Sequence, residues 1–344
     1  MKAMMKASRM LLLSKKRFTA LLVALLTATA ESAHADQKIS IIVAGIEKQI
    51  YLPVKLAEQL GYFSQAGLDV ELLTDRNGIN AETQLLSGAV QGVVGFYDHT
   101  INLQARGKLV KSVILLTQTP GEAVLVSESA SRNITSIAQL SGNAFGVTGL
   151  GSSTNLLIRY LAQQAGIKAT AINIVPVGAG DNFIAALSQG RVQAGITTDP
   201  TISRLTSSGR AMVLLDLRNI KETRSALGGL YPAASLYMPN AWVATHRDEV
   251  QKMVTAIGKA LTYIQTHTAA EIAEQMPVSF YANDKESYVV ALKNSKEMFT
   301  TDGKMPDGGP ETVLNVIKDF DKNLKGKHIN LQNTFTNEFM SSTR

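Results

Sequence analysis

The chain has 344 residues and a mass of 37.0 kDa, enough for one large domain or two of ordinary size. With 45% hydrophobic and 18% charged residues, its composition excludes a largely disordered protein. The 34 lysines and arginines exceed the 28 acids, and the formal charge of +6 raises the question of a nucleic-acid or membrane-surface partner. No cysteine is present, which excludes disulfides, thiolate nucleophiles, zinc–thiolate sites, iron–sulfur clusters and a lipidated cysteine.

The first 35 residues are typical of a secretory signal peptide. Six basic residues and no acid lie within the first 17, and the apolar stretch from Phe18 to Ala30 is too short to span a bilayer. Small residues then form a cleavage site that ends at Ala35. An uncleaved anchor helix is the alternative. We expect export to the periplasm, cleavage near Ala35 and no lipidation. The remaining chain has 28 bases and 27 acids, so its net charge no longer suggests a nucleic-acid partner.

From Lys38 onward, short β-rich runs alternate with helical patterns, which is typical of an α/β fold with mainly parallel sheets. Two series of the form β-α-β-α-β are predicted. Their predicted strands are 39–44, 68–73 and 92–96, then 145–148, 171–175 and 194–197; their predicted helices are 51–60, 81–87, 155–165 and 183–188.

The two series are also related in sequence. Three short motifs recur in the same order, 101 to 105 residues apart: LAEQLG at 56–61 and LAQQAG at 161–166, GAVQ at 88–91 and GRVQ at 190–193, DHTI at 98–101 and DPTI at 199–202. The repeat predicts two lobes with the same winding and a cleft between them.

The rest of the chain is predicted to be mainly helical. We expect a strand at 211–215, β character at 241–244, and helices at 246–265, 268–275, 284–297 and 310–324. Segments 122–127 and 235–243 are predicted to carry the chain between the lobes, and Trp242 is expected in the core.

Ligands of open α/β sheets bind beyond the carboxyl ends of the strands, so the loops there supply the candidate residues of the first lobe. Lys48 offers a positive charge and Gln49 a donor and an acceptor; a solvated loop is the alternative. In the next loop, Arg76 is able to fork onto a carboxylate or sulfonate beside Gly78, although pairing with Asp75 is the alternative.

In the second lobe, the loop from Gly149 to Asn155 joins a predicted strand to a predicted helix. Its glycines allow close approach to a ligand, and its hydroxyl and N–H groups suit an anion. A Ser or Thr N-cap is the alternative. The candidate ligand-binding residues of this loop are Gly151, Ser152, Ser153 and Thr154.

Asp98 and Asp199 each follow a predicted strand and precede a predicted helix. Helix capping accounts for both, and ligand contact is the alternative. Tyr97 and His99 beside Asp98 complete the candidates. A hydrolase would need a nucleophile and a base, and the one pairing that the sequence offers is Ser153 with His99, without a nucleophile elbow. We therefore predict no enzymatic activity and no cofactor or metal.

Several of these segments resemble one known family. Residues 60–70, LGYFSQAGLDV, are similar to the GYF-x-x-x-GL-x-V hallmark of periplasmic substrate-binding proteins of nitrate, sulfonate and taurine ABC transporters, the NMT1/THI5-like family. The SGAVQ, GSST and ALSQGRVQA segments at 87–91, 151–154 and 186–194 resemble further motifs of it, with Gln91 and Gln193 where an acid is usual. So do residues 137–147.

The resemblance implies a two-lobed periplasmic binding protein of type II topology. From the predicted crossing segments we expect lobe 1 at 36–121 and 238–344 and lobe 2 at 122–237. It implies a solute bound in a ligand cleft between closing lobes and delivered to an inner-membrane ABC permease with its cytoplasmic ATPase. Related thiamine-pyrimidine synthases depend on a cysteine-rich motif, which this chain lacks. We expect a monomer; a sensor that presents the solute to a membrane receptor fits equally well.

For the solute, we expect a small organic anion, a sulfonate or a carboxylate, held by the loop at 151–154 with Lys48 or Arg76 as counter-charge. The alternative is a neutral or cationic heterocycle, such as a thiamine-precursor pyrimidine, gripped by Asp98, Asp199 and Tyr97.

Overall fold

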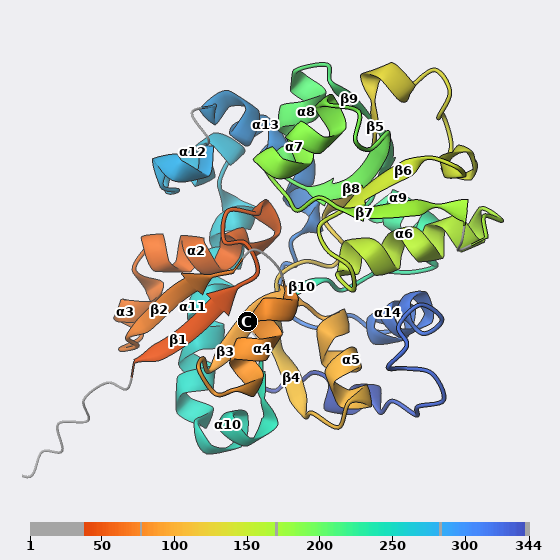
Figure 1. Ribbon diagram of the computed structural model, residues 1–344. Coiled ribbons are helices and arrows are strands. Elements are labelled where there is room, and N and C mark those ends of the chain that lie inside the picture. Colours follow the sequence, from red (N-terminus) through yellow and green to blue (C-terminus); the bar gives the residue numbers. More distant parts are fainter. Residues whose placement is uncertain (1–37, 76–77, 169–170, 282–283, 341–344) are drawn as a thin grey trace, which may run out of the picture. The chain divides into compact units, whose positions relative to one another are not determined.

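The structure is a computed structural model that describes residues 38–75, 78–168, 171–281 and 284–340 (Figure 1). The predicted signal peptide and Arg76 lie outside these residues. Residues 38–344 form one compact unit. Within the described residues, no helix is both long and apolar enough to cross a membrane.

Two five-stranded sheets form the framework (Figure 1). In the first, in the order β2-β1-β3-β10-β4, β1 runs parallel to β2 and β3, and β10 runs antiparallel to β3 and β4. Its strands are β1 (Ile39–Val43), β2 (Val70–Thr74), β3 (Gly92–Phe96), β4 (Val110–Leu115) and β10 (Ala234–Pro239).

The second sheet repeats this arrangement in the order β7-β6-β8-β5-β9. Strand β6 runs parallel to β7 and β8, and β5 runs antiparallel to β8 and β9. Its strands are β5 (Glu122–Ser127), β6 (Ala144–Val147), β7 (Asn173–Pro176), β8 (Ala194–Thr198) and β9 (Ala211–Asp216). The equal strand orders confirm the predicted two-lobed α/β fold, since each sheet receives its antiparallel strand after a crossing from the other lobe.

Helices cover the sheets and extend the chain beyond them (Figure 1). We call the first sheet with α2 to α5 lobe 1, and the second sheet with α6 to α9 lobe 2. The helices are α2 (Leu52–Gln59), α3 (Tyr62–Gln65), α4 (Gly78–Leu86), α5 (Asp98–Ala105), α6 (Ser153–Gln164), α7 (Asp181–Ser188), α8 (Thr201–Ser207), α9 (Ile220–Leu227), α10 (Asn240–Thr245), α11 (Arg247–Thr266), α12 (Ala269–Glu274), α13 (Lys285–Ser295) and α14 (Gly309–Ile317).

The C-terminal helices contact both lobes. Helix α11 packs on α2 and α3, α13 packs on α8, and α14 packs on α5 and α6. The segment 238–344, expected with lobe 1 alone, therefore also touches lobe 2.

The two connections between the lobes lie just before the segments predicted for them. Residues 122–127 are strand β5, and β10 already begins at Ala234 within the first sheet. The chain therefore crosses at residues 116–121 and 228–233. The expected lobe boundary between 237 and 238 falls inside β10.

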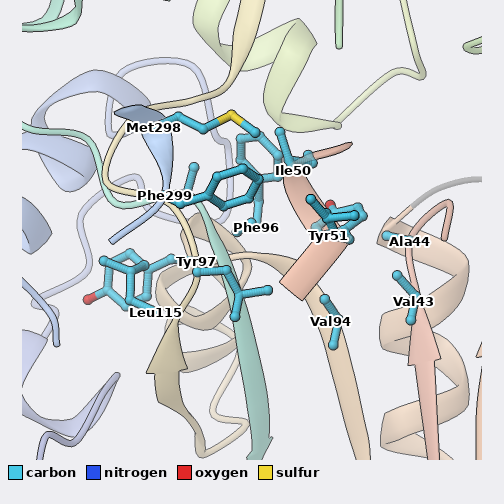
Figure 2. Packing of buried hydrophobic residues seen from close by; sticks show 14 of the residues in the cluster. Val43, Ala44, Ile50, Tyr51, Val94, Phe96, Tyr97, Leu115, Met298 and Phe299 are labelled. Carbon is cyan, nitrogen blue, oxygen red and sulfur yellow. The ribbon is translucent and has the colours of Figure 1, made fainter. Parts of the chain in front are cut away.

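The first connection passes through a tightly packed place. Gly121 has a φ of 65°, and a Cβ added there would lie 2.4 Å from Ile50 and 2.9 Å from the Met298 sulfur. Figure 2 shows Ile50, Met298 and Phe299 packed together with Phe96 beside the first sheet. Only glycine suits this position, because the backbone is left-handed and no side chain fits.

The predicted β character at 241–244 is wrong, because α10 covers Asn240–Thr245. A short apolar run is compatible with helix or strand until its partners are known. Here the Trp242 ring stacks on His246 with centroids 4.4 Å apart, a contact of helical i,i+4 spacing. Trp242 is partly buried against the core, where the sequence placed it.

Candidate functional site

The loops that follow equivalent strands of the two lobes line one cavity. They follow β1 and β3 in lobe 1 and β6 in lobe 2, and the last residue of β8, Thr198, joins them. Strand β5 also contributes, because it runs antiparallel to β8 and its first residue, Glu122, pairs with Thr198. The cavity is lined by Ala44, Lys48, Ile50, Tyr51, Gly78, Phe96, His99, Glu122, Thr148, Ser152, Ser153, Thr154 and Thr198.

This central cavity is narrow and lies between two wider ones. Its volume is about 30 Å³, enough for a water but not for a solute of many atoms. It shares Lys48 and Thr148 with a cavity of about 560 Å³ on one side, and His99 with another of about 560 Å³ on the other. A solute of many atoms would therefore have to extend from this cavity into one of the wider ones.

Lys48 and Gln49 follow β1 but have different surroundings. Lys48 is buried in the cavity wall, where its Nζ donates to the Ala44 carbonyl oxygen at 2.7 Å and burial lowers its pKa. The Gln49 side chain instead donates to the Tyr288 carbonyl oxygen at 3.1 Å and accepts from Ser295 at 3.4 Å. Lys48 is thus available to the cavity, whereas Gln49 fastens the loop to α13.

Glu122 is the residue of the site that sequence reasoning missed. It is 1% exposed, and its Oε2 has no hydrogen-bond partner. Burial raises its pKa well above the usual range, Asp98 raises it further, and Lys48 opposes the change. The available signal was one acid at the start of an otherwise apolar strand, EAVLV. An unpartnered buried carboxyl group is costly and indicates a missing donor.

Asp98 has a similar character. Its Oδ1 accepts a hydrogen bond from the Ser153 hydroxyl at 3.0 Å, across from lobe 1 to lobe 2, and its Oδ2 has no partner. Burial raises its pKa, while His99 and Ser153 oppose the change. Asp98 therefore links the two lobes through Oδ1, while Oδ2 can still accept a hydrogen bond.

The His99 ring lies among polar groups of lobe 1. Its Nδ1 is 3.2 Å from the Tyr237 hydroxyl and 3.3 Å from Glu82 Oε1, and its Nε2 is 3.7 Å from Asp98 Oδ1. Gly78 leaves room for the ring, because a Cβ there would lie 2.2 Å from His99 Cε1. Ser153 donates to Asp98, so the Ser153–His99 pairing considered for a hydrolase does not form.

The Gly-Ser-Ser-Thr loop directs its hydroxyl groups partly into itself. Ser152 Oγ donates to the Gly149 carbonyl oxygen at 2.7 Å, and Thr154 Oγ1 accepts from the Thr148 backbone N–H at 3.1 Å. Both side chains still line the cavity, together with Ser153. Gly151, with a φ of 80°, lines the neighbouring wider cavity.

Asp199 and Tyr97 already form hydrogen bonds with other groups of the protein. Asp199 accepts from Arg218 Nη1 at 2.7 Å and from the Ser203 backbone N–H at 2.9 Å, so it bonds the first turn of α8 from just before the N-cap residue, Pro200, and forms a buried ion pair. The Tyr97 hydroxyl bonds to Thr334, and Figure 2 shows its ring beside Leu115. The aromatic residues of the cavity wall are instead Tyr51 and Phe96.

The fold is that of periplasmic binding proteins, a class that includes the ligand-binding components of ABC import systems. The chain belongs to the family described as NMT1/THI5 like, whose family model matches residues 50–270. This confirms the family to which the sequence motifs pointed.

The chain is also similar to individual proteins. A solved structure from Bordetella bronchiseptica RB50 is 33% identical, with a TM-score of 0.83 over 88% of this chain and 95% of that one. The alkanesulfonate-binding protein SsuA of Xanthomonas axonopodis pv. citri, solved with MOPS bound, is 16% identical with a TM-score of 0.68 over 87% and 98%, and shares the fold. The 4-amino-5-hydroxymethyl-2-methylpyrimidine phosphate synthase THI13 of Saccharomyces cerevisiae is 26% identical over 261 residues, 74% of this chain and 75% of that one.

Proposed function

We propose that this protein is the solute-binding component of an ABC importer and that it closes its two lobes around one small solute. The proposal is supported by the fold, which it shares with such components, and by a cavity lined from both lobes. A solute that contacts both lobes stabilises the closed state by its differential affinity, and a permease can distinguish the closed shape from the open one.

We further propose that the solute presents N–H donors, as an amino-substituted heterocycle does. The observation that carries this proposal is the pair of buried carboxyl groups, Glu122 and Asp98, each with an oxygen that lacks a partner. Solute N–H groups would satisfy both oxygens and remove the cost of leaving them unpaired. The rings of Tyr51 and Phe96 line the central cavity with Glu122 and suit a flat ligand, and Asp98 lines the adjoining wider cavity.

An aminopyrimidine is the first compound to test. The yeast relative is named for a 4-amino-5-hydroxymethyl-2-methylpyrimidine phosphate, whose amino group and flat ring fit the groups just described. The chain has no cysteine and its Ser153 donates to a carboxyl group, so we propose binding of such a compound without its synthesis. Of the residues expected to hold a heterocycle, Asp98 keeps this role, whereas Asp199 and Tyr97 already have partners.

A small organic anion is the second candidate. It is favoured by the buried Lys48 amino group and by the Ser152 and Thr154 hydroxyls on the opposite wall. The fold that this chain shares with an alkanesulfonate-binding protein supports it as well. Against it stands the unpartnered Oε2 of Glu122, to which a carboxylate or a simple sulfonate offers no N–H donor.

Isothermal titration calorimetry can separate the two candidates. We expect one-to-one binding of 4-amino-5-hydroxymethyl-2-methylpyrimidine and at least 100-fold weaker binding of the same ring without its amino group, because unpaired buried acceptors disfavour the analogue. Glu122→Gln should weaken binding about 10- to 100-fold. Binding of methanesulfonate or taurine, with no heat from the pyrimidine, would overturn the heterocycle proposal and favour the anion.

A matched variant controls for loss of fold. Glu128→Gln changes an exposed acid one residue after the same strand and should leave affinity unchanged. We also propose that the protein is periplasmic, that it is a monomer and that it delivers its solute to a permease. Fractionation of cells that express the full chain tests location, and N-terminal sequencing of the exported protein tests cleavage near Ala35.

A further inference from the structure

The two lobes are joined directly by polar groups. The Ser153 hydroxyl at the start of α6 donates to Asp98 at the start of α5, and both residues are buried. The Gln49 backbone N–H of lobe 1 also donates to the Asp199 carbonyl oxygen of lobe 2 at 3.0 Å. A hydrogen bond to a carboxylate that is shielded from water is among the stronger ones.

Asp98 is held in place by a row of lobe 1 side chains. His99 Nε2 faces Asp98 Oδ1, and on its other side His99 Nδ1 faces Glu82 and Tyr237. Glu82 is itself fixed by Arg106, whose Nη1 donates to Glu82 Oε2 at 3.4 Å. The row is buried at its centre, so its members have few alternative partners.

We propose that Ser153 and Asp98 form a latch that holds the lobes closed before a solute arrives, and that His99, seated by Glu82 and Tyr237, is a positioning residue for it. The latch uses Asp98 Oδ1 and leaves Oδ2 unpartnered, so that a solute and Ser153 engage the same carboxyl group together. The effect of the latch on solute affinity rests on the proposed solute-binding function. The effect of the latch on lobe closure does not.

The latch would raise apparent affinity by populating the binding-competent arrangement. If only a fraction of molecules is competent, the apparent Kd is the intrinsic Kd divided by that fraction. A latch therefore reduces the cost of closing that the solute would otherwise bear. It also keeps the carboxyl groups of the cavity away from bulk water.

The absence of cysteine allows a direct measurement of closure. Ser87→Cys just after α4 and Ser188→Cys at the end of α7 place two spin labels on exposed positions, one on each lobe. Pulsed electron paramagnetic resonance then gives the distance distribution without solute. We expect a short-distance population, and we expect Ser153→Ala to reduce the closed-to-open ratio about 10-fold, as loss of a hydrogen bond to a charged group predicts.

Two further variants distinguish loss of the Ser153–Asp98 hydrogen bond from a nonspecific loss of stability. Ser153→Thr keeps the hydroxyl group and should restore much of the short-distance population. Thr223→Val removes a buried hydroxyl that bonds the Leu217 carbonyl oxygen within lobe 2, and it should leave the distances unchanged. A distribution that is the same in the parent and in Ser153→Ala, whether closed or open, would overturn the latch.

The positioning role of His99 is tested by a double-mutant cycle. His99→Gln should lower the closed-to-open ratio in the parent and have little further effect in Ser153→Ala, because it acts through the same bond. Equal effects in both backgrounds would overturn that role. These distances need no solute, so failure of the latch is distinct from failure of the proposed function, which would show as no heat with any pyrimidine or sulfonate.

Discussion

Asp98 and Asp199 occupy equivalent places in the two lobes but have different surroundings. Each opens the repeated motif, DHTI or DPTI; Asp98 is separated from β3 by one residue, and Asp199 directly follows β8. Asp199 lies against the Arg218 guanidinium and bonds the first turn of α8, so its charge is neutralised locally. Asp98 has a neutral hydroxyl as donor, a histidine at 3.7 Å and one unpartnered oxygen. One motif thus yields a structural acid in lobe 2 and a candidate binding acid in lobe 1.

The largest effect that follows from this contrast concerns Arg218. Arg218→Met leaves the Asp199 carboxylate buried without its cation, and we expect the free energy of unfolding to fall by about 3–5 kcal/mol. Urea denaturation followed by circular dichroism measures it. Arg204→Met, which removes a more exposed ion pair with Asp181 in the same lobe, should cost less than about 1 kcal/mol. Equal losses in the two variants would contradict the structural role assigned to Asp199.

Replacing Glu122 should raise the free energy of unfolding, whereas replacing Arg218 should lower it. Because burial raises the pKa of Glu122, the folded protein retains a proton where the unfolded chain has lost it, so stability declines as pH rises from about 4.5 through the raised pKa. Glu122→Gln removes this decline. We expect the variant to be more stable than the parent by about 1–3 kcal/mol at neutral pH and similar to it near pH 4. Melting temperatures at several pH values test this; a destabilised variant at neutral pH would refute it.

Asp98 should follow Glu122 in sign with a smaller effect, because its pKa is also raised by burial but Ser153 and His99 stabilise its charged form. We expect Asp98→Asn to gain about 1 kcal/mol at neutral pH, whereas Asp199→Asn, which breaks the ion pair, should lose stability. Denaturant midpoints of the two variants at pH 7 provide the comparison. A loss in both would mean that the two aspartates are equivalent after all.

Much of the fold could be predicted from local patterns. The strand 92–96 matches β3, and the predicted helix at 246–265 differs from α11 by one residue at each end. Periodicity is strong in these segments, and the repeat indicates that the two lobes share one winding. The stretch at 241–244 failed because four apolar residues carry no distinctive period.

The candidate site was predictable only in part. Lys48 and the loop at 151–154 follow parallel strands, and the rule for open α/β sheets places such loops at the cleft. Glu122 escaped because it was read as part of a linker, and only the antiparallel pairing of β5 with β8 brings it to the same edge. Tyr97 was expected to contact a heterocycle, but the preceding residue, Phe96, lines the cavity, because successive residues at the end of a strand face opposite sides.

The sequence by itself determined the number of lobes, the order of their elements and the positions of the loops at the cleft, since these depend on hydrophobic periods and glycine-containing turns between neighbours in the chain. Only the tertiary structure decided what the two equivalent aspartates do. Arg218 reaches Asp199 from 19 residues away, and Ser153 reaches Asp98 from 55 residues away and from the other lobe. The charge and the role of a buried carboxyl group depend on such partners, which the order of residues along the chain does not reveal.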